Sequence, residues 1–327
     1  MRPYRLSARA ATAAGISVTI AAVAWFWNST HSFIQAAFVV CPGAAFTVML
    51  LLGSGNVLER LQARIEARPA RVMLAPAGLW LLYVVYATGM AIANGMAVIT
   101  MAAYLSVPFV ALWPVRNRPG RVWLEPLVIL WLWLPLELGI VRRILITAPG
   151  ADLHYAFAQL LAIDAGVIAF AVWDRTSYIG YRFEADRRIL RTGISNFLIF
   201  AAIAIPLGLA IGFISYSFSL PKLYPVPALF AGIFLFTALP EEFLFRGLIQ
   251  NWIEHATGNQ RLSLIVAAVI FGAAHLNNGP PIPNYRYFLM AGIAGIFYGR
   301  AWRSTRSLMA SSLTHALVDT FWSVFFR

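Results

Sequence analysis

Two long runs without a single charged side chain constrain this chain more than any other feature. The first lies between Arg9 and Glu59, and the second lies between Arg71 and Arg116. A helix needs about 20 consecutive apolar residues to cross the hydrocarbon core of a membrane. Each run is long enough for two crossings, and a short polar break divides each one, at residues 28–31 and 94–95. The chain is therefore predicted to cross a membrane several times.

Composition supports the same class of protein. Of the 327 residues, 60% are hydrophobic and only 12% are charged, whereas a typical soluble domain has about 25% charged residues. This excludes an ordinary soluble globule, a disordered chain and a fibrous repeat. The apolar runs are long and continuous rather than short and alternating, which favours helices over a membrane β-barrel. We predict an all-α polytopic membrane bundle.

Hydropathy and turn residues predict about eleven transmembrane helices. They cover residues 10–27, 32–53, 72–93, 96–115, 124–141, 155–173, 193–217, 228–252, 262–276, 287–302 and 307–326. We divide the chain into an N-terminal transmembrane region, residues 1–192, with about six helices and no assigned role, and a second region, residues 193–327. The candidate chemistry lies within the second region, at about 230–327.

Arginine-rich connections set the predicted orientation. The net charge is +12, and an excess of basic residues in short loops is typical of the cytoplasmic side. Residues 54–71, 116–121 and 174–191 fit that rule, whereas Arg142–Arg143 falls on the predicted outer side. An odd number of spans places the C-terminus outside. We expect an integral protein of a bacterial cytoplasmic (inner) membrane, in contact with lipid and without a nucleic-acid site.

Ionisable residues inside predicted spans are the candidates for function, since each costs about 2.5–3.5 kcal/mol to insert. The first group is Glu241–Glu242, followed by Arg246. Adjacent carboxylates on a helix point about 100° apart. Glu242 and Arg246 are four residues apart and can pair along one face, which leaves Glu241 to face another helix.

Two further groups follow on the next spans. His275 comes directly after Gly272, Ala273 and Ala274, whose small side chains allow close helix packing. His315 and Asp319 are four residues apart and share one helical face. Helical bundles build sites from facing helices in this way. A carboxylate with imidazoles suits water activation and amide hydrolysis, but Glu241, His275 and His315 equally suit zinc. The residues alone leave both alternatives open, with no cofactor as the first expectation.

The order of these groups resembles the CPBP family of intramembrane proteases. That family includes CAAX prenyl endopeptidases of the Rce1 type and bacteriocin-processing or abortive-infection proteins. Its pattern of EExxxR, then FxxxH, then HxxxN or HxxxD is present in order between Glu241 and Asp319. The resemblance extends over roughly the last 95 residues, and it leaves the first seven spans unassigned.

The resemblance implies a glutamate-type intramembrane endopeptidase. Glu241 and His275 would activate the attacking water, and Glu242 and Arg246 would support the first helix. His315 and position 319 would hold the oxyanion of the tetrahedral intermediate. An ionised Asp only accepts hydrogen bonds, whereas the Asn of other members can donate. Asp319 therefore either is protonated or orients His315.

The implied substrate is a membrane-associated peptide or protein. A prenylated CAAX peptide is the substrate of the best-known relatives. In a bacterium without protein prenylation, a leader peptide or a C-terminal sorting tail is the more plausible expectation. The competing hypotheses are a non-catalytic scaffold or immunity-type membrane protein that retains the fold, and a proton-coupled transporter. The lack of an internal repeat disfavours the transporter.

Two expectations concern geometry. With straight helices over 228–252 and 262–276, Glu241 and His275 would be misaligned along the membrane normal by about 15 Å, so we expect tilted, shifted or broken helices. Among the other intramembrane carboxylates, Glu125 is expected to cap its span and Glu137 to pair with Arg142 or Arg143. Asp164 has no obvious partner.

Overall fold

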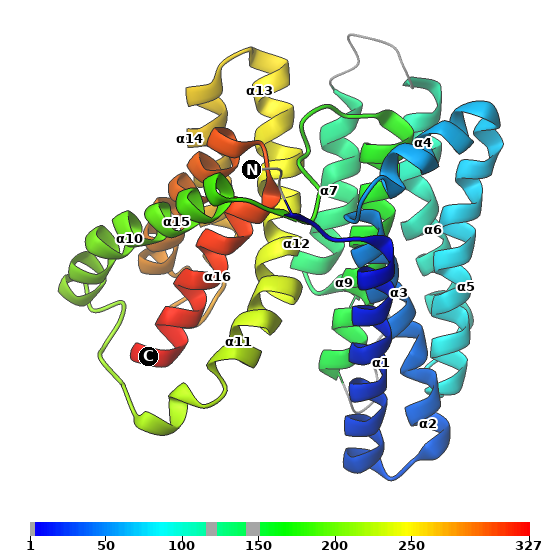
Figure 1. The fold of residues 1–327 in the computed structure, drawn as a ribbon, viewed down its shortest axis with the longest axis horizontal. Helices are drawn as coiled ribbons and strands as arrows, with labels where there is room; N and C mark the ends of the chain where they lie inside the picture. Colours follow the sequence, from blue (N-terminus) through cyan, green and yellow to red (C-terminus); the bar gives the residue numbers. More distant parts are fainter. Residues whose placement is uncertain (1–3, 116–122, 142–150) are drawn as a thin grey trace. The chain divides into compact units, whose positions relative to one another are not determined.

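The computed structural model describes residues 4–115, 123–141 and 151–327, and these residues are helical almost throughout (Figure 1). Within them the only strands are two short ones, β1 (Tyr4–Arg5) and β2 (Glu184–Ala185). The predicted all-α fold is confirmed. The predicted basic connection at 116–121 and the pair Arg142–Arg143, with its expected partnership to Glu137, lie outside the described residues.

Packing divides the chain into two compact units. We call Arg5–Ser177 the N-terminal unit and Tyr178–Arg327 the C-terminal unit. This packing boundary lies between residues 177 and 178. The division of roles between residues 192 and 193 stays a prediction.

The N-terminal unit consists of α-helices with short 3-10 and π segments. Its elements are α1 (Ala8–Thr30), α2 (Phe33–Phe38), α3 (Val40–Leu52), α4 (Val57–Ala67), η1 (Pro69–Met73), α5 (Leu74–Gly89), α6 (Gly95–Leu112), η2 (Trp113–Val115), α7 (Leu124–Glu137), α9 (Ala151–Gly166) and the π-helix η3 (Val167–Asp174). Its core is almost wholly apolar. The single cysteine, Cys41, is buried in it.

The C-terminal unit carries every residue predicted for the site. Its elements are β2, α10 (Arg187–Ala210), η4 (Leu220–Leu223), α11 (Val226–Ile233), the π-helix η5 (Phe234–Ala238), α12 (Leu239–Glu242), the π-helix η6 (Phe243–Gln250), α13 (Asn251–Thr257), α14 (Gln260–Ala273), α15 (Tyr285–Thr305) and α16 (Leu308–Phe325). Helices α10, α15 and α16 pack against one another, and α14 packs along α15.

Seven helical stretches of the described residues are long and apolar enough to cross a membrane. They are Ala8–Thr30, Phe33–Leu52, Pro69–Gly89, Gly95–Leu112, Leu153–Asp174, Arg187–Ala210 and Val226–Thr257. The chain is an integral membrane protein. The other four predicted spans coincide with α7, α14, α15 and α16, which are shorter or more polar, so the total of eleven crossings stays a prediction.

The helical stretch Val226–Thr257 changes its winding on both sides of the two adjacent glutamates. The π-helices η5 and η6 flank α12, which contains Pro240, Glu241 and Glu242. Proline lacks a backbone N–H and disrupts the regular α-helical hydrogen bonds, and π-turns inside helices are frequent at functional sites. The helix is therefore locally rewound where its carboxylates lie.

The expected misalignment of Glu241 and His275 does not occur. The stretch that carries Glu241 continues to Thr257, beyond the predicted end near Trp252, and turns at Gly258 into α14. Glu241 lies 17 residues before Gly258, and His275 lies 17 residues after it. At 1.5 Å per residue both residues are about 25 Å from the turn, so the antiparallel hairpin places them at one level.

Gly272 allows α14 to pack closely on α15, as predicted from its small size. A Cβ atom at Gly272 would lie 2.6 Å from the backbone oxygen of Phe288 on α15. Only glycine permits that approach. The contact brings the end of α14, and with it His275, against the first turns of α15.

Candidate functional site

Glu242 is the buried centre of the polar cluster. Its side chain is fully buried, and one oxygen, Oε2, accepts hydrogen bonds from Nε of Arg246 at 2.9 Å and from the hydroxyl of Ser311. The other oxygen, Oε1, lies 2.9 Å from Nδ1 of His315. Glu242 thereby forms the predicted pair along its own helix, and it also ties that helix to α16.

Arg246 is fully buried beside this carboxylate. Its guanidinium carbon lies 5.0 Å from the ring centre of Phe271, 5.8 Å from that of Tyr298 and 5.9 Å from that of Phe245. Aromatic faces attract cations, most strongly where water is excluded. The buried charge is thus balanced by one carboxylate and three rings.

His315 is held between carboxylates at both ring nitrogens. Its Nδ1 faces Glu242, and its Nε2 lies 3.3 Å from Oδ2 of Asp319 and 3.9 Å from Oε2 of Glu241. Its ring stacks on Tyr298 with 4.4 Å between centres. A hydrogen bond between an imidazole nitrogen and a carboxylate needs one proton. Nδ1 carries one toward Glu242, and a second proton lies between Nε2 and Asp319.

His275 lies in the turn directly after α14. Its Nδ1 is 2.8 Å from the backbone oxygen of Phe271, and its ring packs between Phe271 and Tyr287, with 4.7 and 4.8 Å between ring centres. A carbonyl oxygen only accepts hydrogen bonds, so Nδ1 carries the proton. In the neutral ring Nε2 is then an acceptor, which is the form that a base needs.

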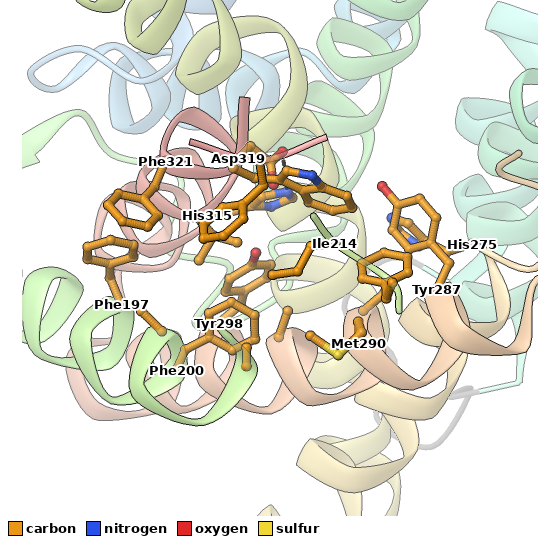
Figure 2. A pocket seen from close by; sticks show the side chains of 18 of the residues that line it. Phe197, Phe200, Ile214, His275, Tyr287, Met290, Tyr298, His315, Asp319 and Phe321 are labelled. Atoms are coloured by element: carbon orange, nitrogen blue, oxygen red, sulfur yellow. Dashed lines mark ion pairs between the residues drawn. The ribbon is translucent and has the colours of Figure 1, made fainter. Parts of the chain in front are cut away.

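A cavity of about 280 Å³ lies in front of the buried pair formed by Glu242 and Arg246, and the other site residues line it. Its polar lining includes Glu241, His275, His315 and Asp319, and the apolar remainder comes largely from α10, α15 and α16. Figure 2 shows Phe197 and Phe200 of α10 on one side and His275 with Tyr287 on the other, with His315 and Asp319 between them. Four of the six predicted residues therefore line one cavity, while Glu242 and Arg246 lie buried behind it.

Comparison with known protein families found a match. Residues 223–321 match the model of the type II CAAX prenyl endopeptidase Rce1-like family. This segment is therefore similar to an Rce1-like domain. It includes all six predicted site residues and most of the cavity lining. No curated protein and no solved structure matches the chain.

The Rce1-like domain does not assemble the three residues named for zinc into a ligand set. Within the described residues, no group of three or more His, Cys, Asp or Glu side chains has the geometry to hold a metal ion. His315 directs both of its nitrogens at carboxylates, and Nε2 is 3.9 Å from Glu241.

Several residues of the domain were not singled out from the sequence. Ser311 hydrogen-bonds Glu242, Tyr298 stacks on His315, and Tyr287 packs on His275. Two signals could have found them. Ser311 lies one turn before His315, and Tyr298 lies eight residues before the turn at Arg306, whereas His315 lies nine residues after it. Tyr287 follows from no such spacing, because a long turn precedes it.

Proposed function

We propose that this chain is an intramembrane endopeptidase of the CAAX-protease type, acting in a bacterial cytoplasmic membrane. It would hydrolyse a peptide bond near the membrane surface. The observation that carries the proposal is the shared cavity, in which Glu241 and His275 lie with His315 and Asp319 inside an Rce1-like domain.

Glu241 is the proposed general base, with His275 as its partner. The Glu241 side chain is 31% exposed, so a water molecule can reach its carboxylate. Water oxygen bonds to the scissile carbonyl carbon, while one water proton passes to Glu241 and the carbonyl electrons move to oxygen. Nε2 of His275 accepts a hydrogen bond from the same water. A positioned base contributes about 10²–10⁴-fold to such a reaction.

The second half of the reaction breaks the carbon–nitrogen bond. The oxyanion electrons reform the carbonyl, the amine departs, and the proton held by Glu241 passes to the amine nitrogen. The products are a carboxylic acid and an amine. His315 lines the cavity, and in this proposal its Nε2–H is shared between Asp319 and the developing oxyanion. Hydrogen bonds to that charge lower the barrier by a few kcal/mol.

Glu242 and Arg246 act as positioning residues in this proposal. The carboxylate of Glu242 holds Nδ1 of His315 and fixes both the tautomer and the direction of the ring. Arg246 compensates the buried charge of Glu242. The pair therefore supports the cavity from behind and does not touch the substrate.

The cavity lining favours an apolar, membrane-associated peptide as the substrate. Beyond the polar groups, the walls are formed by side chains such as Phe197, Phe200, Phe321 and Trp322. The matching family is described as CAAX prenyl endopeptidases, so a prenylated C-terminal peptide is one proposed substrate. A leader peptide or a C-terminal sorting tail is the other.

The test compares new peptide termini in membranes of the source organism. Membranes carrying wild type, Glu241→Gln or Glu254→Gln would be profiled by mass spectrometry, with and without a chelator. Glu254 pairs with Arg306 and does not line the cavity, so its variant is a matched control. Termini that appear with wild type and Glu254→Gln, persist with the chelator and vanish with Glu241→Gln support the proposal and identify the cleaved bond.

Two other outcomes would replace the proposal. Loss of the termini on chelation as well would favour the zinc-dependent alternative. Identical profiles for wild type and a stably produced Glu241→Gln would sink catalysis by Glu241, and they would favour the non-catalytic scaffold or immunity-type protein.

A further inference from the structure

The chain lacks a donor at the position where an asparagine would supply one. The negative charge that develops on the carbonyl oxygen needs hydrogen-bond donors. Asp319 has no N–H group, and as a carboxylate it repels an oxyanion. The cavity nevertheless contains neutral polar side chains, those of Thr237, Asn278, Tyr287 and Tyr298. Of these, Tyr287 packs directly on His275. The following inference rests on the proposed function and concerns this donor.

Tyr287 is fixed in the first turn of α15 and lines the cavity. Its ring packs on His275 at 4.8 Å, on Phe213 at 5.2 Å and on Trp322 at 5.6 Å between ring centres. Contacts with three rings leave the phenol little freedom to turn. Tyr287 lines the same cavity as Glu241 and Asp319. It is therefore placed among the groups that surround the reacting carbonyl.

The proton of the Tyr287 hydroxyl can point into the cavity. The side chains of Asn278 and Tyr287 both line the cavity. An amide N–H beside the phenol can donate to a lone pair of its oxygen. A phenolic O–H is both acceptor and donor, so its own hydrogen is then directed away from Asn278. An oxyanion in the cavity is a suitable acceptor.

Asn284 holds both groups in place. It is buried, its amide nitrogen donates to the backbone oxygens of Asn278 at 3.1 Å and Gly279 at 3.3 Å, and its side-chain oxygen accepts from the backbone N–H of Tyr287 at 3.0 Å. One side chain thus fixes the turn that carries Asn278 and also caps the helix that carries Tyr287.

We propose that the Tyr287 hydroxyl is a further catalytic residue, which donates a hydrogen bond to the oxyanion in place of the donor that Asp319 lacks. The bond strengthens as the carbonyl electrons move to oxygen and weakens when the carbonyl reforms. The phenol keeps its proton throughout. Asn284 is the positioning residue for this donor.

The test uses the full-length protein and a quenched peptide that spans the bond found by terminus profiling. Tyr287→Phe removes the hydroxyl and keeps the ring contacts. We expect kcat to fall about 10²-fold, the effect of losing one oxyanion donor, with KM changed less than about 2-fold, since the bond forms mainly in the transition state. Tyr285→Phe is the matched control, because Tyr285 is 70% exposed and does not line the cavity.

A double-mutant cycle with Asp319→Asn distinguishes two roles for the Tyr287 hydroxyl, that of an oxyanion donor and that of a purely structural group. Asparagine restores an N–H group at position 319, so in that background Tyr287→Phe should lower kcat by only about 10-fold. Groups that act on the same atom show such coupling, whereas the effects of independent sites simply add. A wild-type kcat for Tyr287→Phe, a loss confined to KM, or equal losses in both backgrounds would overturn the inference.

The proposed function and this inference fail in different ways. If wild type cleaves and Glu241→Gln does not, the function stands, and the Tyr287 variants alone decide the inference. If wild type and Glu241→Gln give the same termini, the function fails and the inference fails with it. Thermal unfolding of each purified variant in detergent checks that the fold is intact.

Discussion

The two units of the chain differ most in what they bury. In the described part of the N-terminal unit, the buried polar side chains are Ser54, His154 and Asp164, whereas the C-terminal unit buries thirteen, including Glu242, Arg246 and His315. Both units consist of helices and share a membrane-protein composition. The two units therefore have the same type of fold and differ in the number of polar side chains that they bury.

This contrast supports placing the proposed chemistry in the C-terminal unit. A charged or polar group in a low-dielectric interior is costly unless it is paired, so a dense polar cluster persists where its members satisfy one another. In the C-terminal unit Glu242 contacts Arg246, Ser311 and His315 together. Glu242 is paired in this way behind the cavity, although Nη1 and Nη2 of Arg246 have no hydrogen-bond partner among the described residues. A cluster that is paired behind a cavity, and open toward it through Glu241 and His275, is suited to the proposed catalysis. The N-terminal unit shows no comparable cluster among its described residues.

The largest expected effect comes from removing the charge at the centre of that cluster. Glu242→Gln leaves the buried guanidinium of Arg246 without its counter-charge. Breaking one partner of a buried pair typically costs about 3–5 kcal/mol, so we expect the free energy of unfolding to fall by about that amount. Activity should be lost as well, because His315 loses its orientation. Denaturant unfolding in detergent measures the first effect, and the cleavage assay measures the second.

The matched control lies in the N-terminal unit. Glu66 and Arg175 form an ion pair at 2.8 Å, but their side chains are 61% and 34% exposed. Exposed pairs contribute about 0–1 kcal/mol, so Glu66→Gln should change the free energy of unfolding by less than about 1 kcal/mol. Equal effects of the two substitutions would contradict the contrast between the units.

Two adjacent serines allow the contribution of a single hydrogen bond in the cluster to be measured. Ser311 and Ser312 are both fully buried on α16, but only the hydroxyl of Ser311 contacts Glu242, whereas the Ser312 hydroxyl has no hydrogen-bond partner among the described residues. Ser311→Ala should lower the free energy of unfolding by about 1.5 kcal/mol, as for strong hydrogen bonds within membrane proteins.

Ser312→Ala should be neutral or slightly stabilising, since it removes an unsatisfied polar group. Thermal and denaturant unfolding of the two variants side by side provides the measurement. A loss for Ser312→Ala as large as that for Ser311→Ala would mean that packing, and not the contact with Glu242, determines both effects.

Most of the fold could be predicted because a membrane permits few solutions. Charge-free runs in a bilayer must become helices, and each of the eleven predicted spans coincides with helical structure. The form of the distortion in the helix that carries Glu241 was harder to predict. Distorted helices were expected, but the sequence did not indicate that the distortion would be two π-helices, η5 and η6, on both sides of Pro240. The helix end at Thr257 was also placed too early, near Trp252.

The candidate site was predictable wherever pairing is local. The spacing of Glu242 with Arg246 and of His315 with Asp319 fixes both contacts within a single helix. Contacts between helices were not predictable, because they depend on register. The sequence did not indicate that Glu242 would hold Nδ1 of His315, nor that Tyr287 would lie against His275. Small residues such as Gly272 indicated that helices approach closely there, but not which side chains then meet.

The smallest expected effect has the opposite sign and concerns the N-terminal unit. Asp164 is fully buried in α9, and neither carboxyl oxygen has a hydrogen-bond partner among the described residues. An unsatisfied buried polar group costs about 1–3 kcal/mol, and an alanine in its place leaves only a small void in a helix that it suits. Asp164→Ala should therefore raise the free energy of unfolding by about 1 kcal/mol.

The nearby substitution Leu161→Ala is the control, because it should change the free energy of unfolding in the opposite direction. Leu161 is fully buried on the same helix, and its truncation should lower the free energy of unfolding by about 2–5 kcal/mol. If Asp164→Ala instead destabilises the protein while Leu161→Ala behaves as expected, Asp164 has a polar partner of its own. The N-terminal unit would then contain a buried, paired carboxylate like Glu242 in the C-terminal unit, in addition to its buried hydrogen bond between Tyr86 and His154, and the contrast between the two units would have to be revised.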